Sequence, residues 1–313
     1  MNTATILKHE NREAWLTQRN KGIGGTDISA ILGVNKWKTP YDVWLDKTGR
    51  APKFEGNKMT RRGQYMEDAV TNYFTDVTGN RVIKASEAEE MLIHNTYPFL
   101  LGSPDRRYFS PDGKKGILEC KTTMASIEQD MESIPQAWFI QGQWYMGLSD
   151  YKIGTIAWGE LGFTSEFKHL EIDFNPDFFA YMVEQAVGFW EKFVMNDTPP
   201  PATTREDILK MYPFHSDSKY VDGDAELEKL CESLKSLKSD KKQLEGDIEI
   251  AEDALKLLIG DAEGARYNGA ILATWKAAKG SVKFDDKALK EADPVTWSKY
   301  TKETTGSRRL LLK

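Results

Sequence analysis

Two carboxylates and one amine lie close together in the sequence, within residues 105–121. Asp105 is the last residue of the segment Gly102–Asp105, at the end of one predicted strand. A short turn at 110–113 follows, and a second predicted strand then contains Glu119 and Lys121. Because strand side chains alternate between faces, Glu119 and Lys121 are expected to share one face of a strand. A hairpin would bring Asp105 alongside them. Carboxylate oxygens suit hard divalent cations that activate water, which is what cutting a phosphodiester requires. An exposed strand with a polar face is the alternative interpretation.

Three further features have the residue types that a phosphodiesterase needs. Glu67 flanks the apolar stripe of a predicted helix, although a surface glutamate is the simpler reading. Gln141 and Tyr145 are four residues apart on another predicted helix and therefore share a face, either as site residues or as a polar seam. Arg19 precedes a glycine-rich segment that ends at Thr26. Such a segment admits a phosphate close to the backbone, or it is a plain turn.

Composition limits the class of protein. The 313 residues include 40% apolar and 11% aromatic residues, enough for a large packed core. The sequence has no run of about 20 apolar residues and no signal peptide, so a membrane partner is not expected. Two cysteines, Cys120 and Cys231, exclude a disulfide framework and a four-cysteine metal or iron–sulfur site within one chain. A reducing cytoplasm is the expected location.

Charge is unevenly distributed. The formal net charge is −6, which argues against a protein that coats DNA generally. Residues 264–313 nevertheless contain 11 Lys/Arg against 5 Asp/Glu, a net of +6, whereas the rest contains 31 against 43, a net of −12. An acidic body agrees with a carboxylate-rich metal site, and DNA would then need a local basic lining.

The pattern of apolar residues divides the chain into three parts. Residues 1–222 alternate predicted helices and strands, which indicates an α/β domain with a central mixed sheet flanked by helices. Trp15, Trp37 and Trp44 are expected to anchor its core. The predicted helices are 12–19, 27–32, 59–77, 135–148 and 176–194, and the predicted strands are 81–84, 91–94, 105–109, 116–121, 151–158 and 167–173.

Residues 223–263 form a predicted coiled-coil helix. Leucine and other apolar residues recur there at alternating steps of three and four over more than four heptads, from Leu227 to Leu258. Lys241 interrupts this seam, and a polar residue at such a position can fix register and partner number. The helix either pairs with another chain or folds back on its own. Residues 264–313 are expected to form a small basic α+β appendage, with strands at 267–275 and 307–312.

Taken together, these motifs resemble the YqaJ-like viral recombinase family. That family includes exonucleases similar to lambda exonuclease, within the PD-(D/E)XK nuclease superfamily. The resemblance covers roughly residues 12–215. Its blocks, in order, are Trp15–Arg19, Gly22–Asp27, Ala30–Gly33, Trp37–Pro40, Trp44, Gly63 to Glu67, Gly102–Asp105, Glu119 to Lys121 and Gln141 to Tyr145.

The resemblance implies a PD-(D/E)XK core at 1–222 and a metal site that binds Mg²⁺, with Mn²⁺ as a substitute. Asp105 and Glu119 would be its direct ligands, with the backbone carbonyl of Cys120 completing the shell. Glu67 resembles the helical glutamate that supports the metal. Lys121 would position or deprotonate the attacking water and stabilise charge on the phosphate.

Other residues are implied to bind DNA. Gln141 and Tyr145 match the motif that orients the site and the DNA. Arg19 and Thr26 match the pair that holds a 5′-terminal phosphate in lambda-type exonucleases. The resemblance therefore implies a Mg²⁺-dependent exonuclease that degrades linear double-stranded DNA ends 5′ to 3′. Its product would be a 3′ single strand for a single-strand annealing protein. The extra residues 224–313 put the ring-shaped trimer of lambda exonuclease in doubt, and a homo-oligomer is left open.

Two alternatives remain at this stage. One is an endonuclease or a RecB-like or Cas4-like nuclease of the same fold. The low cysteine content argues against its iron–sulfur versions, and the Arg19–Thr26 pair favours recognition of DNA ends. The other, from a different class, is a non-catalytic DNA-end-binding or phage assembly protein. A protein that descends from a nuclease but has lost its activity would be expected to lack a metal ligand. Glu67, Asp105 and Glu119 are all present.

Overall fold

The computed structural model describes residues 3–52, 56–84, 90–162, 166–302, 306 and 308–312. The chain forms two compact units, Met1–Met211 and Tyr212–Lys313, which are described in turn. Within the described part of the chain, no helix is both long and apolar enough to cross a bilayer.

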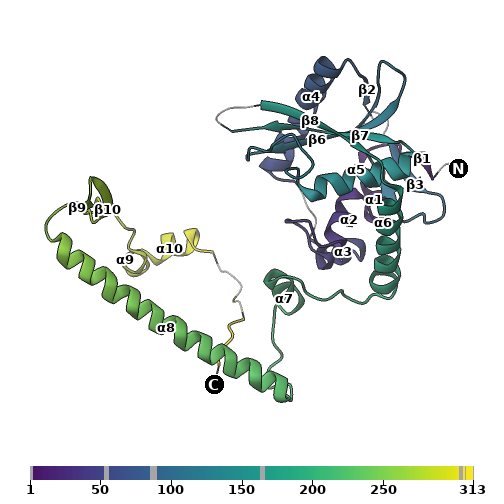
Figure 1. Ribbon diagram of the computed structural model, residues 1–313. Helices are drawn as coiled ribbons and strands as arrows, with labels where there is room; N and C mark the ends of the chain where they lie inside the picture. Colours follow the sequence, from purple (N-terminus) through teal and green to yellow (C-terminus); the bar gives the residue numbers. More distant parts are fainter. Residues whose placement is uncertain are drawn as a thin grey trace. The chain divides into compact units, whose positions relative to one another are not determined.

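Among the described residues, a five-stranded mixed sheet is the centre of the first unit (Figure 1). In spatial order its strands are β2 (Arg81–Lys84), β5 (Arg106–Phe109), β6 (Lys115–Thr123), β7 (Ile153–Glu160) and β8 (Glu166–Asp173). Strands β6 and β7 run parallel, and the other neighbours run antiparallel. A smaller antiparallel sheet has the order β1 (Ala4–Lys8), β3 (Glu90–His94) and β4 (Leu101–Gly102). The predicted α/β class with a central mixed sheet is confirmed.

Several helices of the first unit begin at a side chain that accepts a free backbone amide. Asn11 accepts the amide of Ala14 at the start of α1, and Asn57 accepts that of Thr60 at the start of α4. Helix α4 ends at Gly79, whose φ of 70° is in the left-handed region that favours glycine. The helices are α1 (Arg12–Asn20), α2 (Gly25–Ile31), α3 (Pro40–Lys47), α4 (Lys58–Thr78), α5 (Gln136–Ser149), α6 (Pro176–Phe189) with a π-helical extension (Trp190–Met195), and α7 (Arg205–Met211).

The sheet packs against a separate apolar core on each face. On one face, helix α4 meets Leu118 and Cys120 of strand β6. On the other, α5 and α6 meet Ile117 of the same strand. Figure 1 shows α4 and α5 on opposite sides of β6 and β7. Strand alternation predicts that Glu119 and Lys121 share the face of Ile117. The hydrogen bond from Lys121 to Gln141 of α5, the helix on that face, agrees with this prediction.

Some features of the first unit depart from the prediction. Strand β1 and helix α3 were not predicted. Strand β1 is mostly exposed and therefore lacks an alternating apolar pattern. Trp15 and Trp44 are buried as expected, but Trp37 is 93% exposed. Trp37 lies in a loop where Asn35 accepts its backbone amide, and this turn leaves the ring in solvent.

The second unit contains the long helix and the small appendage. Its elements are α8 (Ala225–Ile259), β9 (Gly264–Tyr267), β10 (Ala270–Thr274), α9 (Asp286–Ala292) and α10 (Pro294–Tyr300). The strand predicted at 267–275 is instead part of a hairpin, because Asn268 and Gly269 adopt φ values of 50° and 83° that reverse the chain. The strand predicted at 307–312 is wrong over its described residues 308–312, which form no strand. Residue 307 lies outside the described residues.

Candidate active site

Asp105 and Glu119 meet where strands β5 and β6 separate. The ladder between these strands ends at the pair Arg106–Leu118, so the backbone groups beyond it are available to side chains. The amide of Asp105 donates to Oε1 of Glu119 at 3.2 Å, and the amide of Cys120 donates to Oδ2 of Asp105 at 2.9 Å. Each carboxylate accepts an amide from the neighbouring segment, which fixes the two side chains beside each other.

Lys121 connects these carboxylates to helix α5. Its Nζ lies 2.8 Å from Oε2 of Glu119 and donates to Oε1 of Gln141 at 2.9 Å. The Gln141 amide in turn donates to the hydroxyl of Tyr145 at 3.3 Å. Burial raises the pKa of Tyr145, with the Glu119 charge adding to the effect, so the phenol is neutral. A continuous polar chain therefore runs from the sheet to α5.

Glu67 approaches the same place from helix α4. Its Oε2 lies 3.7 Å from the guanidinium of Arg106, which also bonds to Asp68 at 3.2 Å and to the carbonyl of Asp105 at 2.7 Å. Arg106 is buried, so it supplies a fixed positive charge that orients Glu67. The motif analysis missed Arg106. The available signal was a charged residue directly after Asp105 in a segment predicted to be a strand.

The electrostatics of the cluster are dominated by its carboxylates. Burial and the nearby Asp105 charge raise the pKa of Glu119 to about 8, although Lys121 opposes this shift. Burial and Asp105 also raise the pKa of Glu67. Burial alone would lower the pKa of Lys121, but Glu119 and Asp105 raise it above its ordinary value, so the amine stays charged. In both carboxyl groups burial is the larger cause of the raised pKa, and the Asp105 charge adds to it.

Arg19 and Thr26 lie at either end of the glycine-rich segment, and both are exposed. The segment extends the edge of the small sheet: the amide of Ile23 donates to Phe99 at 2.7 Å, and the amide of Leu101 donates to Ile23 at 2.8 Å. Strand-like pairing therefore positions the segment against β4.

Gly25 joins this segment to the polar chain on α5. A Cβ built at Gly25 would lie 2.9 Å from carbons of both Gln141 and Tyr145. Real Cβ atoms essentially never come so close, so glycine is what lets the start of α2 lie against α5. This contact brings Thr26 to the same site as Gln141.

A buried carboxylate holds the two ends of the segment. Asp27 accepts the amide of Gly24 at 3.0 Å and forms ion pairs with Lys47 at 2.7 Å and Lys38 at 2.9 Å. Lys47 also donates to the carbonyl of Arg19 at 3.4 Å. Burial alone would raise the pKa of Asp27, but the charges of Lys47 and Lys38 and the Gly24 amide hold it well below its ordinary value. Sequence reasoning missed this clamp because its partners lie far apart in the chain.

One polar cavity of about 590 Å³ collects the two groups of residues. Acidic residues are on one part of its wall and two arginines of α1 are on another. Arg12 and Arg19 flank the ring of Trp15, with guanidinium carbons 4.1 and 5.3 Å from its centroid. The predicted site residues in its wall are Arg19, Thr26, Glu67, Asp105, Gln141 and Tyr145. Glu119 lies behind this wall, and Lys121 lines a small adjoining cavity with Glu67 and Cys120.

The residues suit a hard divalent cation by their chemistry. Glu67, Asp105 and Glu119 offer carboxylate oxygens, the ligands that hard divalent cations prefer. Within the described ranges, however, no three acidic, histidine or cysteine side chains already surround one point. The physical reason is that Glu119 is turned toward the Asp105 amide and Lys121.

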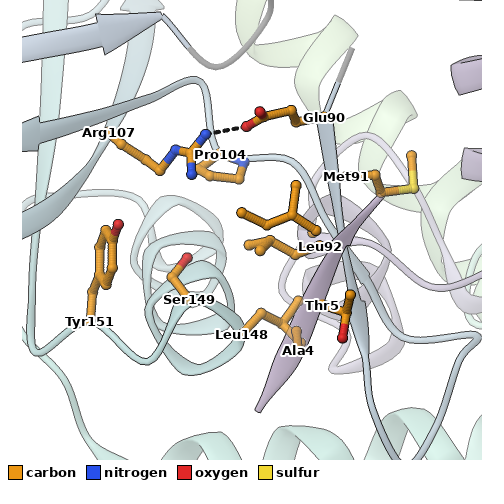
Figure 2. A pocket seen from close by; sticks show the side chains of 12 residues that line it. Ala4, Thr5, Glu90, Met91, Leu92, Pro104, Arg107, Leu148, Ser149 and Tyr151 are labelled. Carbon is orange, nitrogen blue, oxygen red and sulfur yellow. Dashed lines mark hydrogen bonds and ion pairs between the residues drawn. The ribbon is translucent and has the colours of Figure 1, made fainter. Parts of the chain in front are cut away.

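A second, mainly apolar cavity of about 260 Å³ adjoins the polar one (Figure 2). Glu90 and Met91 line both cavities. Figure 2 shows Arg107 paired with Glu90 at one end, and Ser149 and Tyr151 on the opposite wall. None of the predicted site residues lines this cavity.

Comparison with known proteins identifies relatives of the chain. Residues 14–152 match the YqaJ-like viral recombinase domain. The uncharacterized protein YqaJ of Bacillus subtilis (strain 168) is 32% identical over 301 residues, which cover 94% of this chain and 92% of that protein. The uncharacterized protein R354 of Acanthamoeba polyphaga mimivirus is 28% identical over 96 residues, or 31% of this chain and 17% of that protein.

Solved structures resemble the chain more distantly. An alkaline exonuclease from Laribacter hongkongensis has a TM-score of 0.46 at 12% identity, over 59% of this chain and 93% of that one. A phage-related exonuclease from Haemophilus somnus 129PT has a TM-score of 0.40 at 18% identity, over 56% of this chain and 96% of that one.

Proposed function

Because the chain belongs to the YqaJ-like viral recombinase family, we propose that it is a metal-dependent DNA exonuclease acting on linear duplex ends. The observation that carries this proposal is the polar cavity. It combines acidic residues suited to a cation with exposed cations suited to a phosphate. A nuclease needs both, since it must bind a polyanion and assist attack on one of its phosphates.

Asp105 and Glu119, supported by Glu67 and the Cys120 carbonyl, would hold the metal, with Mg²⁺ as the natural ion and Mn²⁺ as a substitute. When bound, the ion lowers the pKa of a water and neutralises charge on the phosphate oxygens. Hydrogen bonds from the backbone amides of Asp105 and Cys120 keep the Asp105 and Glu119 carboxylates adjacent. Binding of a metal would therefore need little reorganisation of the backbone.

Lys121 would act on the water and the phosphate, and Gln141 and Tyr145 would hold it in position. Lys121 is charged, so it stabilises negative charge developing on the phosphate. Gln141 fixes the position of the lysine through its 2.9 Å bond, and Tyr145 fixes Gln141. Acid–base and positioning groups of this kind contribute about 10²–10⁴-fold in rate, less than the metal.

Arg19 and Thr26 would bind the 5′-terminal phosphate. Both are exposed in the cavity, and the Asp27 clamp holds the chain on either side of them. An anchor at the 5′ end sets the direction of degradation as 5′ to 3′. It leaves a 3′ single strand, the substrate of a single-strand annealing protein.

A time course on labelled linear duplex with Mg²⁺ tests this function. The proposal predicts release of nucleotides from 5′ ends, faster with a 5′ phosphate than without it, and no cutting of covalently closed circles. Cutting of closed circles would support an endonuclease instead. Absence of any metal-dependent release would support a binding protein.

Arg19→Gln should reduce the preference for 5′-phosphorylated ends by about 10- to 100-fold, the value of a lost hydrogen bond to a charged group. Lys21→Gln is the matched control, because Lys21 is also exposed and cationic but does not line the polar cavity. Equal preferences in Arg19→Gln and the native protein would remove Arg19 from the site.

A further inference from the structure

Helix α8 has a long apolar seam that is exposed to solvent and interrupted only at Lys241. The helix has 35 residues and is therefore about 52 Å long at 1.5 Å per residue. Its seam positions alternate in steps of three and four, as in a coiled coil. The large apolar residues on this seam that are between 41% and 85% exposed are Leu227, Leu230, Leu237, Leu244, Ile248, Leu255 and Leu258. A contiguous apolar surface of this kind marks an interface.

We propose that the occupant of this seam is α8 of a second copy of the chain, in antiparallel orientation. In an antiparallel pair, each a position packs against a d position of the partner. Placing Lys241 opposite Leu244 of the second copy also places Leu234 opposite Ala251, and Leu227 opposite Leu258. All ten seam positions, from Leu227 to Leu258, are then paired, and the register is centred on the middle of the helix.

Charge favours the antiparallel pair over a parallel one. A parallel pair in register would place Lys241 against its own copy in the apolar seam. It would also place Asp240 beside Glu245, and Asp247 beside Glu252. Each of these contacts is between like charges, and their repulsion disfavours the parallel orientation.

The antiparallel register separates the two lysines. It places Lys238 beside Glu245 of the second copy, twice by symmetry, which is an attractive contact. Asp240 lies near Asp247 of the second copy, also twice by symmetry, and the attractive Lys238–Glu245 contacts balance that repulsion. The parallel pair has no attractive contact of this kind to balance its own repulsions. The lysine that interrupts the seam thus selects the orientation.

Cysteine cross-linking of the full-length protein tests the orientation. In a Cys231→Ser background, the double variant Leu234→Cys/Ala251→Cys should form a covalent dimer on mild oxidation. Neither single variant should, because opposed positions in this register differ. Light scattering should give twice the chain mass of 35.6 kDa. A cross-link in Leu234→Cys alone would show a parallel pair and overturn the proposal, as would a monomeric or trimeric mass.

A second variant separates interface from folding. Leu237→Lys/Leu244→Lys puts charges in the seam and should halve the mass, while circular dichroism still reports a folded protein. Leu257→Lys is the matched control, because Leu257 is 84% exposed on the same helix but lies off the seam. It should leave the dimer intact. Dissociation by both variants alike, or by neither, would contradict the proposed interface.

Discussion

At the scale of single residues, the site is defined by where carboxylates are buried. Glu119 is fully buried, yet both of its oxygens have partners, in the Asp105 amide and the Lys121 ammonium. A buried charge is tolerated only when it is paired in this way. The cost is visible in its pKa, raised to about 8. A strongly perturbed carboxyl that lies directly behind the wall of a cavity is typical of a functional site.

Asp27 shows the opposite pattern, which predicts a pH dependence of stability. The pKa of Asp27 is lowered in the folded protein. Its contribution to the free energy of unfolding is therefore complete at pH values above its ordinary pKa of 3.8, and it is lost as the pH falls through the folded-state pKa. Asp27→Asn should therefore lower the free energy of unfolding at pH 7 by about 3–5 kcal/mol, because it leaves Lys47 buried without its carboxylate. The difference from the native protein should narrow below about pH 4.

Urea unfolding at several pH values measures this effect. Asp46→Asn is the control, because Asp46 pairs with the same Lys38 but its side chain is 37% exposed. An exposed pair contributes only about 0–1 kcal/mol. A difference between Asp27→Asn and the native protein that did not change with pH would contradict the assigned role of the charge.

At the scale of elements, the site depends on α2 lying directly against α5. Gly25→Ala should push the start of α2 away from Gln141 and Tyr145, since the added Cβ would lie 2.9 Å from each. Overpacking of this kind costs about 1–3 kcal/mol, and the displaced Gln141 should slow cleavage. Gly24→Ala is a sharp control, because a Cβ there meets no atom closer than 3.8 Å. Melting temperature and nuclease rate should fall only in Gly25→Ala.

The elements also show what the sequence could and could not predict. Strands β5 to β8 and helices α4, α5 and α8 have strong periodic patterns, and their boundaries agree with the prediction within a few residues. The alternation along β6 correctly placed Glu119 and Lys121 on one face. The exposed strand β1 has no such pattern. The hairpin turn has the Asn268–Gly269 pair that is typical of a two-residue turn, and the prediction of one strand across it overlooked that signal. Periodicity reports burial, so elements that bury little escape it.

The candidate site residues were predicted for a different reason, and their role stays a prediction. Their types and order along the chain are distinctive, whereas the Asp27–Lys47 clamp and Arg106 depend on contacts made only in three dimensions. Sequence spacing predicts neighbours within one element, but it contains no signal for ion pairs between separate helices. These supporting residues therefore emerge only from the fold.

At the scale of the whole molecule, charge is divided between an acidic body and a basic C-terminal part. Residues 264–313 have a net charge of +6. Contacts between such residues and phosphates release counterions, so each adds about 0.9 to the slope of log affinity against log salt for duplex DNA. Removing residues 264–313 should reduce this slope by several units in fluorescence-anisotropy titrations. An unchanged slope would mean that these residues do not contact DNA.

The central claim is that Asp105 holds the cation that cuts DNA. The most direct measurement is Mg²⁺-dependent nucleotide release from linear duplex by Asp105→Asn, alongside metal-free binding of the same ends. Asp112→Asn, in the exposed turn between β5 and β6, is the control and should cut normally. We predict that Asp105→Asn lowers release about a thousandfold, or about 4 kcal/mol of barrier, while end binding is retained. Release near the native rate would contradict the account.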